Sequence, residues 1–210
     1  MLDKMSLRLL SPYLDSTARI LKRYQVTPDQ ISVAGFMVGM VGVGAIALGH
    51  NYSALFLILL NRTADGLDGT LARLTEPTDS GAFLDISLDF VFYSAVVFGF
   101  ALADPARNGL AAAALIFSFV GTGSSFLAFA VLAERRHISD LRLPGKGFYY
   151  LGGLAEGTET IIFFVLICLF PAGFPILAWI FAAICFLTTG LRIFYGYRTL
   201  RADQRKHPSV

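Results

Sequence analysis

Four aspartates lie close together in a chain that is otherwise strongly apolar: Asp65, Asp68, Asp85 and Asp89. The members of the first pair are three residues apart and those of the second pair four apart, so each pair lies on one face of its own helix. A short break between the pairs allows a helical hairpin to bring all four acids together. Uncompensated carboxylates are costly in a membrane interior, and Mg²⁺, Mn²⁺ or Ca²⁺ would be their natural partners.

The composition indicates a membrane protein with one domain. Of the 210 residues 55% are hydrophobic and 15% charged, and the apolar residues form blocks of about 20, the length that crosses a bilayer. The net charge of +2 gives no reason to expect nucleic acid as a partner. Cys168 and Cys185 fall inside apolar blocks and are interpreted as packing residues. The N-terminal stretch lacks the features of a signal peptide.

The hydropathy pattern predicts an all-α membrane protein: six transmembrane helices preceded by an N-terminal amphipathic surface helix. The amphipathic segment covers residues 1–25, the six-helix domain 26–200 and a cytoplasmic tail 201–210. Thr27 and Pro28 are expected to begin the first span as N-cap and first-turn residue. The predicted spans cover about residues 29–49, 53–74, 81–103, 109–133, 149–170 and 175–197.

The distribution of Lys and Arg predicts the orientation. The N-terminal arm, the 134–148 loop and the C-terminal tail are rich in basic residues, whereas the loops on the opposite side hold only Arg107. Because basic residues collect in cytoplasmic loops, both termini and the acid cluster should face the cytoplasm.

Acids that bind divalent metal at the cytoplasmic side suit phosphoryl or phosphatidyl transfer. Metals neutralise charge on a pyrophosphate, and one carboxylate can take the proton of an attacking hydroxyl. A solvated helix face with ion pairs is the plainer explanation of such acids. The apolar residues that flank them leave little solvated surface, which favours a functional site.

The region from Asp65 to Asp89 resembles the signature of the CDP-alcohol phosphotransferases, the CDP-alcohol phosphatidyltransferase family. Its pattern is Asp65-x-x-Asp68-Gly69-x-x-Ala72-Arg73, seven residues, then Gly81-x-x-x-Asp85-x-x-x-Asp89, and every defined position is present. The stretch 142–161 is similar to an uncharacterised bacterial inner-membrane branch of the family. The resemblance implies an inner-membrane enzyme of phospholipid synthesis. Such an enzyme transfers the phosphatidyl group of CDP-diacylglycerol to a small alcohol and releases CMP.

The resemblance also implies the roles of individual residues. Asp65, Asp68 and Asp85 would hold two divalent cations, Mg²⁺ or Mn²⁺, and Asp89 would bind the second cation and act as the base. The CDP-lipid would contact Thr27, Pro28, Asp29, Gln30, Asp65, Gly69, Ala72, Arg73 and Thr78. For the first four of these, helix initiation is an alternative explanation. A homodimer formed through apolar spans is implied as well.

The acceptor alcohol is less clearly indicated. The candidates for its pocket are Arg135, Lys146, Glu156, Glu159 and Arg192. The inositol-phosphate branch carries an arginine-bearing Glu-Arg-Pro-Glu-Arg run at the start of the fifth span, and here the acids remain without the arginines. This favours a neutral or amine-bearing alcohol, although the three basic candidates could supply charge for a phosphate.

Two alternative functions follow from the same residues. The donor could be another CDP-alcohol with diacylglycerol as acceptor, or the chain could be a divalent-cation transporter that uses the four acids as its ion site. A transport path would spread its acids across the membrane. The clustering of the acids near one side, with Arg73 beside them, favours the enzyme.

Overall fold

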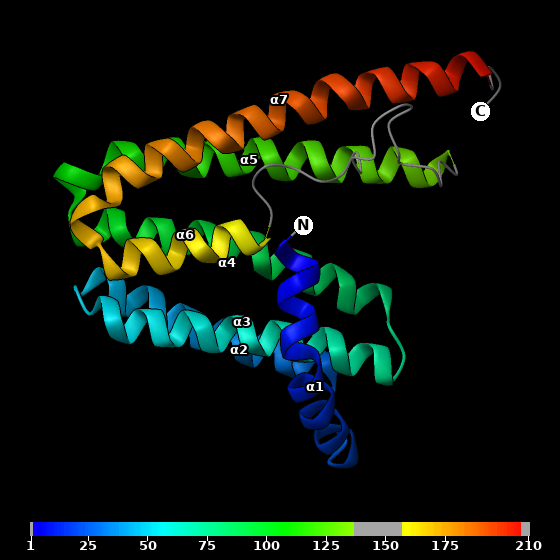
Figure 1. The fold of residues 1–210 in the computed structure, drawn as a ribbon, viewed down its shortest axis with the longest axis horizontal. Helices are drawn as coiled ribbons and strands as arrows, with labels where there is room; N and C mark the ends of the chain where they lie inside the picture. Colours follow the sequence, from blue (N-terminus) through cyan, green and yellow to red (C-terminus); the bar gives the residue numbers. More distant parts are fainter. Residues whose placement is uncertain (1, 137–156, 207–210) are drawn as a thin grey trace.

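The computed structural model describes residues 2–136 and 157–206 (Figure 1), and this part of the chain is helical without any strand, which confirms the predicted all-α class. The elements are α1 (Leu2–Arg23), α2 (Pro28–Ala47), α3 (Asn51–Leu74), α4 (Asp79–Ala103), α5 (Pro105–Arg135), α6 (Gly157–Leu169), the 3₁₀ turn η1 (Pro171–Gly173) and α7 (Phe174–Lys206).

Among these described helices, four stretches are long and apolar enough to cross a membrane. They are α2, α4, α5 and the segment Pro171–Asp203, which contains η1 and most of α7. The apolar helix α6 is shorter, and α3 has four charged residues from its middle onward. The beginning of the predicted fifth span, residues 149–156, lies outside the described residues. The total of six spans therefore stays a prediction.

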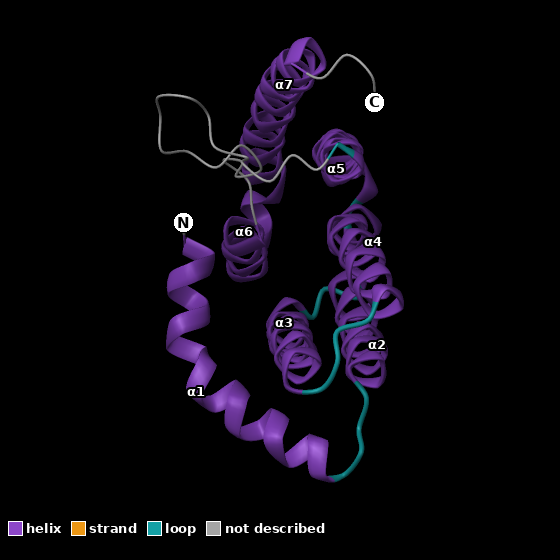
Figure 2. Ribbon diagram, turned by 90° about the vertical axis from the view of Figure 1, so that its right-hand side faces the viewer, coloured by secondary structure: helices purple, strands orange, loops and turns teal. Residues whose placement is uncertain are grey.

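Helices α2 to α6 run side by side along the long axis of the molecule, whereas α1 lies crosswise to them (Figures 1 and 2). Helix α2 packs on α3 and α4, α5 packs on α4 and α7, and α1 packs mainly on α3. The α3–α4 connection lies at one end of the bundle, and the α2–α3, α4–α5 and α6–α7 connections lie at the other (Figure 1). This arrangement places the end of α3 beside the start of α4.

Aromatic residues form the centre of the bundle. Phe92, Phe100, Phe164 and Phe174 are fully or almost fully buried, and Phe100 stacks on Phe174 with ring centroids 4.7 Å apart. Between membrane helices such rings stabilise the contacts mainly through close van der Waals packing, because lipid tails are as apolar as the rings themselves. Their packing fixes α4 against α6 and α7.

Threonines begin the two helices that lead into the acid-rich region. Thr27 caps α2: its Oγ1 accepts from the Gln30 backbone N–H at 3.3 Å, and Gln30 Oε1 accepts from the Thr27 N–H at 3.1 Å. This capping box confirms the predicted start of the helix. Thr78 caps α4 with its side chain alone: Thr78 Oγ1 accepts from the Gly81 N–H at 3.0 Å.

Two glycines of α2, Gly35 and Gly39, permit close helix packing. A Cβ at Gly35 would lie 2.7 Å from the Ala64 side chain, and one at Gly39 would lie 2.6 Å from the Phe92 ring. Neither position can hold a larger residue without displacement of α3 or α4. These contacts fix the depth at which α2 lies against the acid-bearing helices.

Candidate active site

The helical hairpin brings all four aspartates to one small cleft. Asp65 and Asp68 come from α3, Asp85 and Asp89 come from α4, and together they line a cavity of about 10 Å³ between α2, α3 and α4. This volume is roughly that of one water or ion. Helical spacing and the short α3–α4 turn are thus sufficient to assemble the cluster, as the sequence predicted.

An arginine that the sequence interpretation passed over lies within this cluster. Arg62 Nη1 is 2.8 Å from Asp89 Oδ1 and 3.6 Å from Asp65 Oδ1, and the Arg62 side chain is only 8% exposed. The guanidinium therefore compensates part of the negative charge of the cleft. An arginine three residues before Asp65 in an apolar helix was the available signal, because cations inside membrane segments commonly have an acidic partner.

Asp68 lies at the α2 side of the cleft. It is buried, with 4% of the residue exposed, and its Oδ2 is 2.5 Å from Ser32 Oγ. The Ser32 hydroxyl also lies 3.2 Å from the Pro28 carbonyl oxygen. Ser32, like Arg62, was not predicted from the sequence as a residue of the site. A serine within an apolar helix does not by itself indicate a functional role.

A much larger cavity, of about 670 Å³, opens beside the acid cleft. It lies where the C-terminal parts of α1 and α3 meet the N-terminal parts of α2 and α4, and Ser32, Asp68 and Asp85 line both cavities. Its volume is within the range of small-molecule and cofactor sites. The acid cleft therefore borders a cavity large enough for a small-molecule ligand.

Most of the predicted CDP-lipid residues line this larger cavity: Thr27, Pro28, Asp29, Gly69, Ala72, Arg73 and Thr78. Asp65 lines only the small cleft, and Gln30 lines neither cavity, because its side chain completes the α2 capping box. Lys22 and Gln25, from α1 and the turn after it, are lining residues that the sequence interpretation had not included.

Gly69 and Arg73 lie at the wall of the larger cavity, and the space beside the Gly69 Cα is open. A Cβ at Gly69 would lie no closer than 3.5 Å to any neighbouring group, and that group is Arg73 Nη1. Packing within the protein thus gives no reason for a glycine here, in contrast to Gly35. The Arg73 guanidinium donates to Thr70 Oγ1 at 2.9 Å and borders the cavity, so it is held close to any ligand there.

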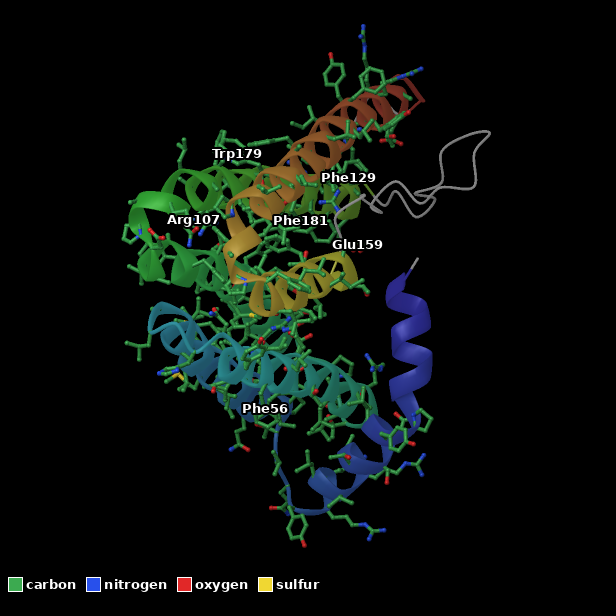
Figure 3. All side chains as sticks on the ribbon, turned by 60° about the vertical axis from the view of Figure 1, so that its left-hand side comes forward. Phe56, Arg107, Phe129, Glu159, Trp179 and Phe181 are labelled. Atoms are coloured by element: carbon green, nitrogen blue, oxygen red, sulfur yellow. The ribbon has the colours of Figure 1, made fainter. Side chains whose placement is uncertain are left out.

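The structure describes three of the five acceptor candidates, Arg135, Glu159 and Arg192. Lys146 and Glu156 lie outside the described residues, and Arg135 is exposed at the end of α5. Glu159 lies near the start of α6, toward the opposite end of the helices from Arg107 (Figure 3). Arg192 of α7 donates from Nη1 to the Thr122 carbonyl oxygen at 3.1 Å and stacks over Phe126.

The donor chemistry of the cleft fits a divalent cation such as Mg²⁺ or Mn²⁺. The four carboxylates offer only oxygen ligands around a space of ionic size. Within residues 2–136 and 157–206, no three His, Cys, Asp or Glu side chains already stand in a geometry that would hold a metal ion. Arg62 contacts one oxygen each of Asp65 and Asp89, which leaves the other lone pairs of these two carboxylates for an ion.

The chain resembles proteins of known family along most of its length. The profile of the CDP-alcohol phosphatidyltransferase family matches residues 25–191. The inner membrane protein YnjF of Escherichia coli (strain K12) is 53% identical over 206 residues, which cover 98% of this chain and all of that protein. The archaetidylinositol phosphate synthase of Pyrococcus horikoshii is 26% identical over 79% of this chain and 81% of its own.

A solved structure shows the same fold. The phosphatidylinositol phosphate synthase of Mycobacterium tuberculosis, in complex with manganese and citrate, superposes with a TM-score of 0.65. The sequences are 22% identical, and the match covers 88% of each chain. Another structure of that synthase has CDP-DAG bound. The protein is thus an enzyme of the CDP-alcohol phosphatidyltransferase family, a helical membrane-type transferase of phospholipid synthesis.

Proposed function

We propose that this enzyme transfers the phosphatidyl group of CDP-diacylglycerol to the hydroxyl of a small alcohol and releases CMP. The observation that carries the proposal is the boundary between the two cavities. Asp68, Asp85 and Ser32 line both the acid cleft and the cavity of about 670 Å³. A pyrophosphate at this boundary would lie beside the acids, with its nucleotide in the larger space.

In this proposal the four aspartates hold two divalent cations, Mg²⁺ or Mn²⁺, with Asp65, Asp68 and Asp85 as ligands and Asp89 at the second ion. The bound cations would neutralise charge on the pyrophosphate. The manganese in the structure of the Mycobacterium tuberculosis synthase supports a divalent metal in this fold.

The walls of the larger cavity would bind the CDP-lipid. Arg73 offers a planar cationic fork to phosphate oxygens. Gly69 and Ala72 keep the α3 surface low enough for the nucleotide, and the open space beside the Gly69 Cα supports this role. Thr27 and Thr78 line the cavity in addition to capping α2 and α4, so the two explanations for these residues are compatible.

The reaction would be a direct in-line displacement. The acceptor oxygen forms a bond to the phosphorus of the phosphatidyl group, and the bond from that phosphorus to the oxygen bridging to CMP breaks. Asp89 accepts the proton of the acceptor hydroxyl, and CMP leaves with the electron pair of the broken bond. A positioned carboxylate that borders the cleft is the group suited to this proton transfer.

The proposed setting is a bacterial inner membrane crossed six times, with the site and both termini in the cytoplasm. Helix α3 has 24 residues and is about 36 Å long at 1.5 Å per residue, enough to span despite its charges. Leu14 and Ala18 of α1 are buried while Tyr13 is exposed, and α1 lies crosswise to the bundle (Figure 2). These features suit a surface helix at the cytoplasmic end of a six-helix domain, which would form homodimers through its apolar helix faces.

Purified protein in liposomes with CDP-diacylglycerol, Mg²⁺ or Mn²⁺ and a panel of alcohols tests the proposal. The panel should pair neutral and amine-bearing alcohols with glycerol phosphate and inositol phosphate, because Glu156 and Glu159 in the sequence disfavour a phosphorylated acceptor. We expect alcohol-dependent release of CMP and a new lipid identifiable by mass spectrometry. Metal flux without CMP release would overturn the proposal, and CMP release only when another CDP-alcohol and diacylglycerol are supplied would reassign the donor.

A further inference from the structure

Arg62 is held in the acid cleft by partners that carry no charge. Its Nε donates to Asn61 Oδ1 at 2.8 Å, and Asn61 Nδ2 donates to the Gly35 carbonyl oxygen of α2 at 2.9 Å. The guanidinium also lies over the rings of Phe92 and Tyr93, 4.9 Å and 5.2 Å from their centroids. Its position is therefore fixed by α2, α3 and α4 independently of the carboxylates.

The charged end of this arginine contacts Asp89 on one side, and a tyrosine contacts it on the other. Arg62 Nη1 donates to Asp89 Oδ1 at 2.8 Å and to Tyr93 Oη at 3.1 Å. The Tyr93 hydroxyl in turn donates to Asp89 Oδ2 at 3.3 Å. Each oxygen of this carboxylate thus has one protein donor, and each keeps a lone pair for a further partner.

We propose that Arg62 and Tyr93 are positioning residues that fix the orientation of the Asp89 carboxylate for its reaction with the acceptor hydroxyl. The inference rests on the proposed function, in which Asp89 is the base. Asp89 lies on α4 one turn before Tyr93, and without these two donors its side chain could rotate toward the other three acids. Donors that orient a reacting group are typically worth about 10–100-fold in activity or metal affinity.

An alternative role for Arg62 would be that of a counter-ion that leaves the cleft when metal binds. The neutral contacts to Asn61, Phe92 and Tyr93 argue against this, because they would all be lost if the guanidinium moved away. The cleft also remains attractive to cations with Arg62 in place, since four carboxylates and one guanidinium leave a formal charge of −3. Arg62 can therefore stay while metal enters.

The decisive variants are Arg62→Met, Arg62→Lys and Tyr93→Phe, with Arg198→Met and Tyr52→Phe as controls on exposed side chains. Tyr93→Phe removes only the hydroxyl and keeps the ring contacts with Phe92 and Phe164, so it should fold. The measurements are kcat, KM for CDP-diacylglycerol, Mn²⁺ binding followed by electron paramagnetic resonance, and monodispersity in detergent.

We expect Arg62→Met to lower kcat about 10–100-fold while KM is kept and Mn²⁺ affinity is not weakened, because removing the guanidinium makes the cleft more negative. Tyr93→Phe should lower kcat by a smaller factor. Arg62→Lys should recover part of the loss, because a lysine can reach Asp89 but cannot also hold Asn61. Unchanged kcat in Arg62→Met and Tyr93→Phe would overturn the proposal. A loss of kcat matched by an equal loss of Mn²⁺ binding would also overturn it, since Arg62 would then act on metal loading.

The wild-type protein separates this inference from the proposed function. If the wild type transfers the phosphatidyl group and the variants do so equally well, the proposed function stands and the positioning role is wrong. If the wild type releases no CMP with any alcohol, the role given to Asp89 is wrong, and the positioning role falls with it.

Discussion

At the scale of single residues, Asp89 is the most informative position. Asp89→Asn keeps the size of the side chain and can still accept from Arg62, but it cannot take a proton from the acceptor. We expect the rate of transfer to fall by about 10²–10⁴-fold, the usual contribution of a general base. Binding of CDP-diacylglycerol, measured as thermal protection, should remain detectable. Turnover within tenfold of the wild type would remove Asp89 from the role of base.

Asp65 and Asp68 should behave differently, because they are proposed to hold metal without taking part in proton transfer. Replacing either by Asn should raise the Mg²⁺ concentration needed for activity and weaken CDP-lipid binding at the same time. The measurement is a Mg²⁺ titration of CMP release at two lipid concentrations. Full activity in the presence of excess chelator would contradict the metal assignment for all four aspartates.

Gly69 gives a steric test of the nucleotide cavity. A methyl group there fits within the protein itself, where it would approach nothing closer than 3.5 Å, so Gly69→Ala should fold normally. If the nucleotide lies against this surface, the methyl group should weaken its binding by about 1–3 kcal/mol, which is roughly 5- to 150-fold in KM. Gly44→Ala is the matched control, since a Cβ at Gly44 meets nothing within 4 Å and lies far from the cavity. Equal KM values for both variants would argue against the nucleotide site.

The spacing of residues in the sequence was enough to predict the cluster of four aspartates. It was not enough to predict the arginine that compensates part of their charge. The four aspartates are recognisable from helical periodicity, and the structure brings them to one cleft. Arg62, Ser32 and Tyr93 came from three different helices, and each alone has an ordinary packing explanation. Their roles depend on how α2, α3 and α4 cross, which periodicity along one helix does not determine.

At the scale of elements, the threonine caps determine where α2 and α4 begin. Thr27→Ala removes the side-chain acceptor of the capping box and should cost about 1 kcal/mol of stability. Thr27→Ser keeps the hydroxyl and should therefore keep the stability of the wild type. The measurement is thermal unfolding in detergent without lipid, which excludes any contribution of Thr27 to ligand binding. Identical unfolding curves for the alanine and serine variants would show that the cap is unimportant.

The apolar blocks of the sequence and the breaks between them predicted the positions of the helices closely. They did not predict equally well which helices cross the membrane. The predicted second span began near residue 53, and α3 begins at Asn51. Hydropathy alone does not identify α3 as a span, because four charged residues lie between its middle and its end: Arg62, Asp65, Asp68 and Arg73. The charged residues of α3 that line the two cavities are the same ones that keep α3 from meeting a hydropathy criterion.

At the scale of the whole molecule, the arrangement of the chain ends and turns predicts which residues face the cytoplasm. The α3–α4 connection beside the acid cleft and the end of α7 lie at one end of the bundle, and the α4–α5 connection lies at the other (Figure 1). If the basic-rich side is cytoplasmic, residues near Arg107 face the periplasm and the end of α7 faces the cytoplasm. The active site would then open to soluble alcohols in the cytoplasm.

Cysteine labelling in cells tests this orientation. Both native cysteines are buried, at 0% and 1% exposure, so the background should be low. Ala106→Cys and Ala202→Cys each place a thiol at an exposed position, one in the first turn of α5 and one near the end of α7. In spheroplasts, a membrane-impermeant maleimide should label Ala106→Cys at once and Ala202→Cys only after lysis. The opposite pattern would place the acid cleft on the periplasmic side, where the supply of CDP-lipid and alcohol would require a different explanation.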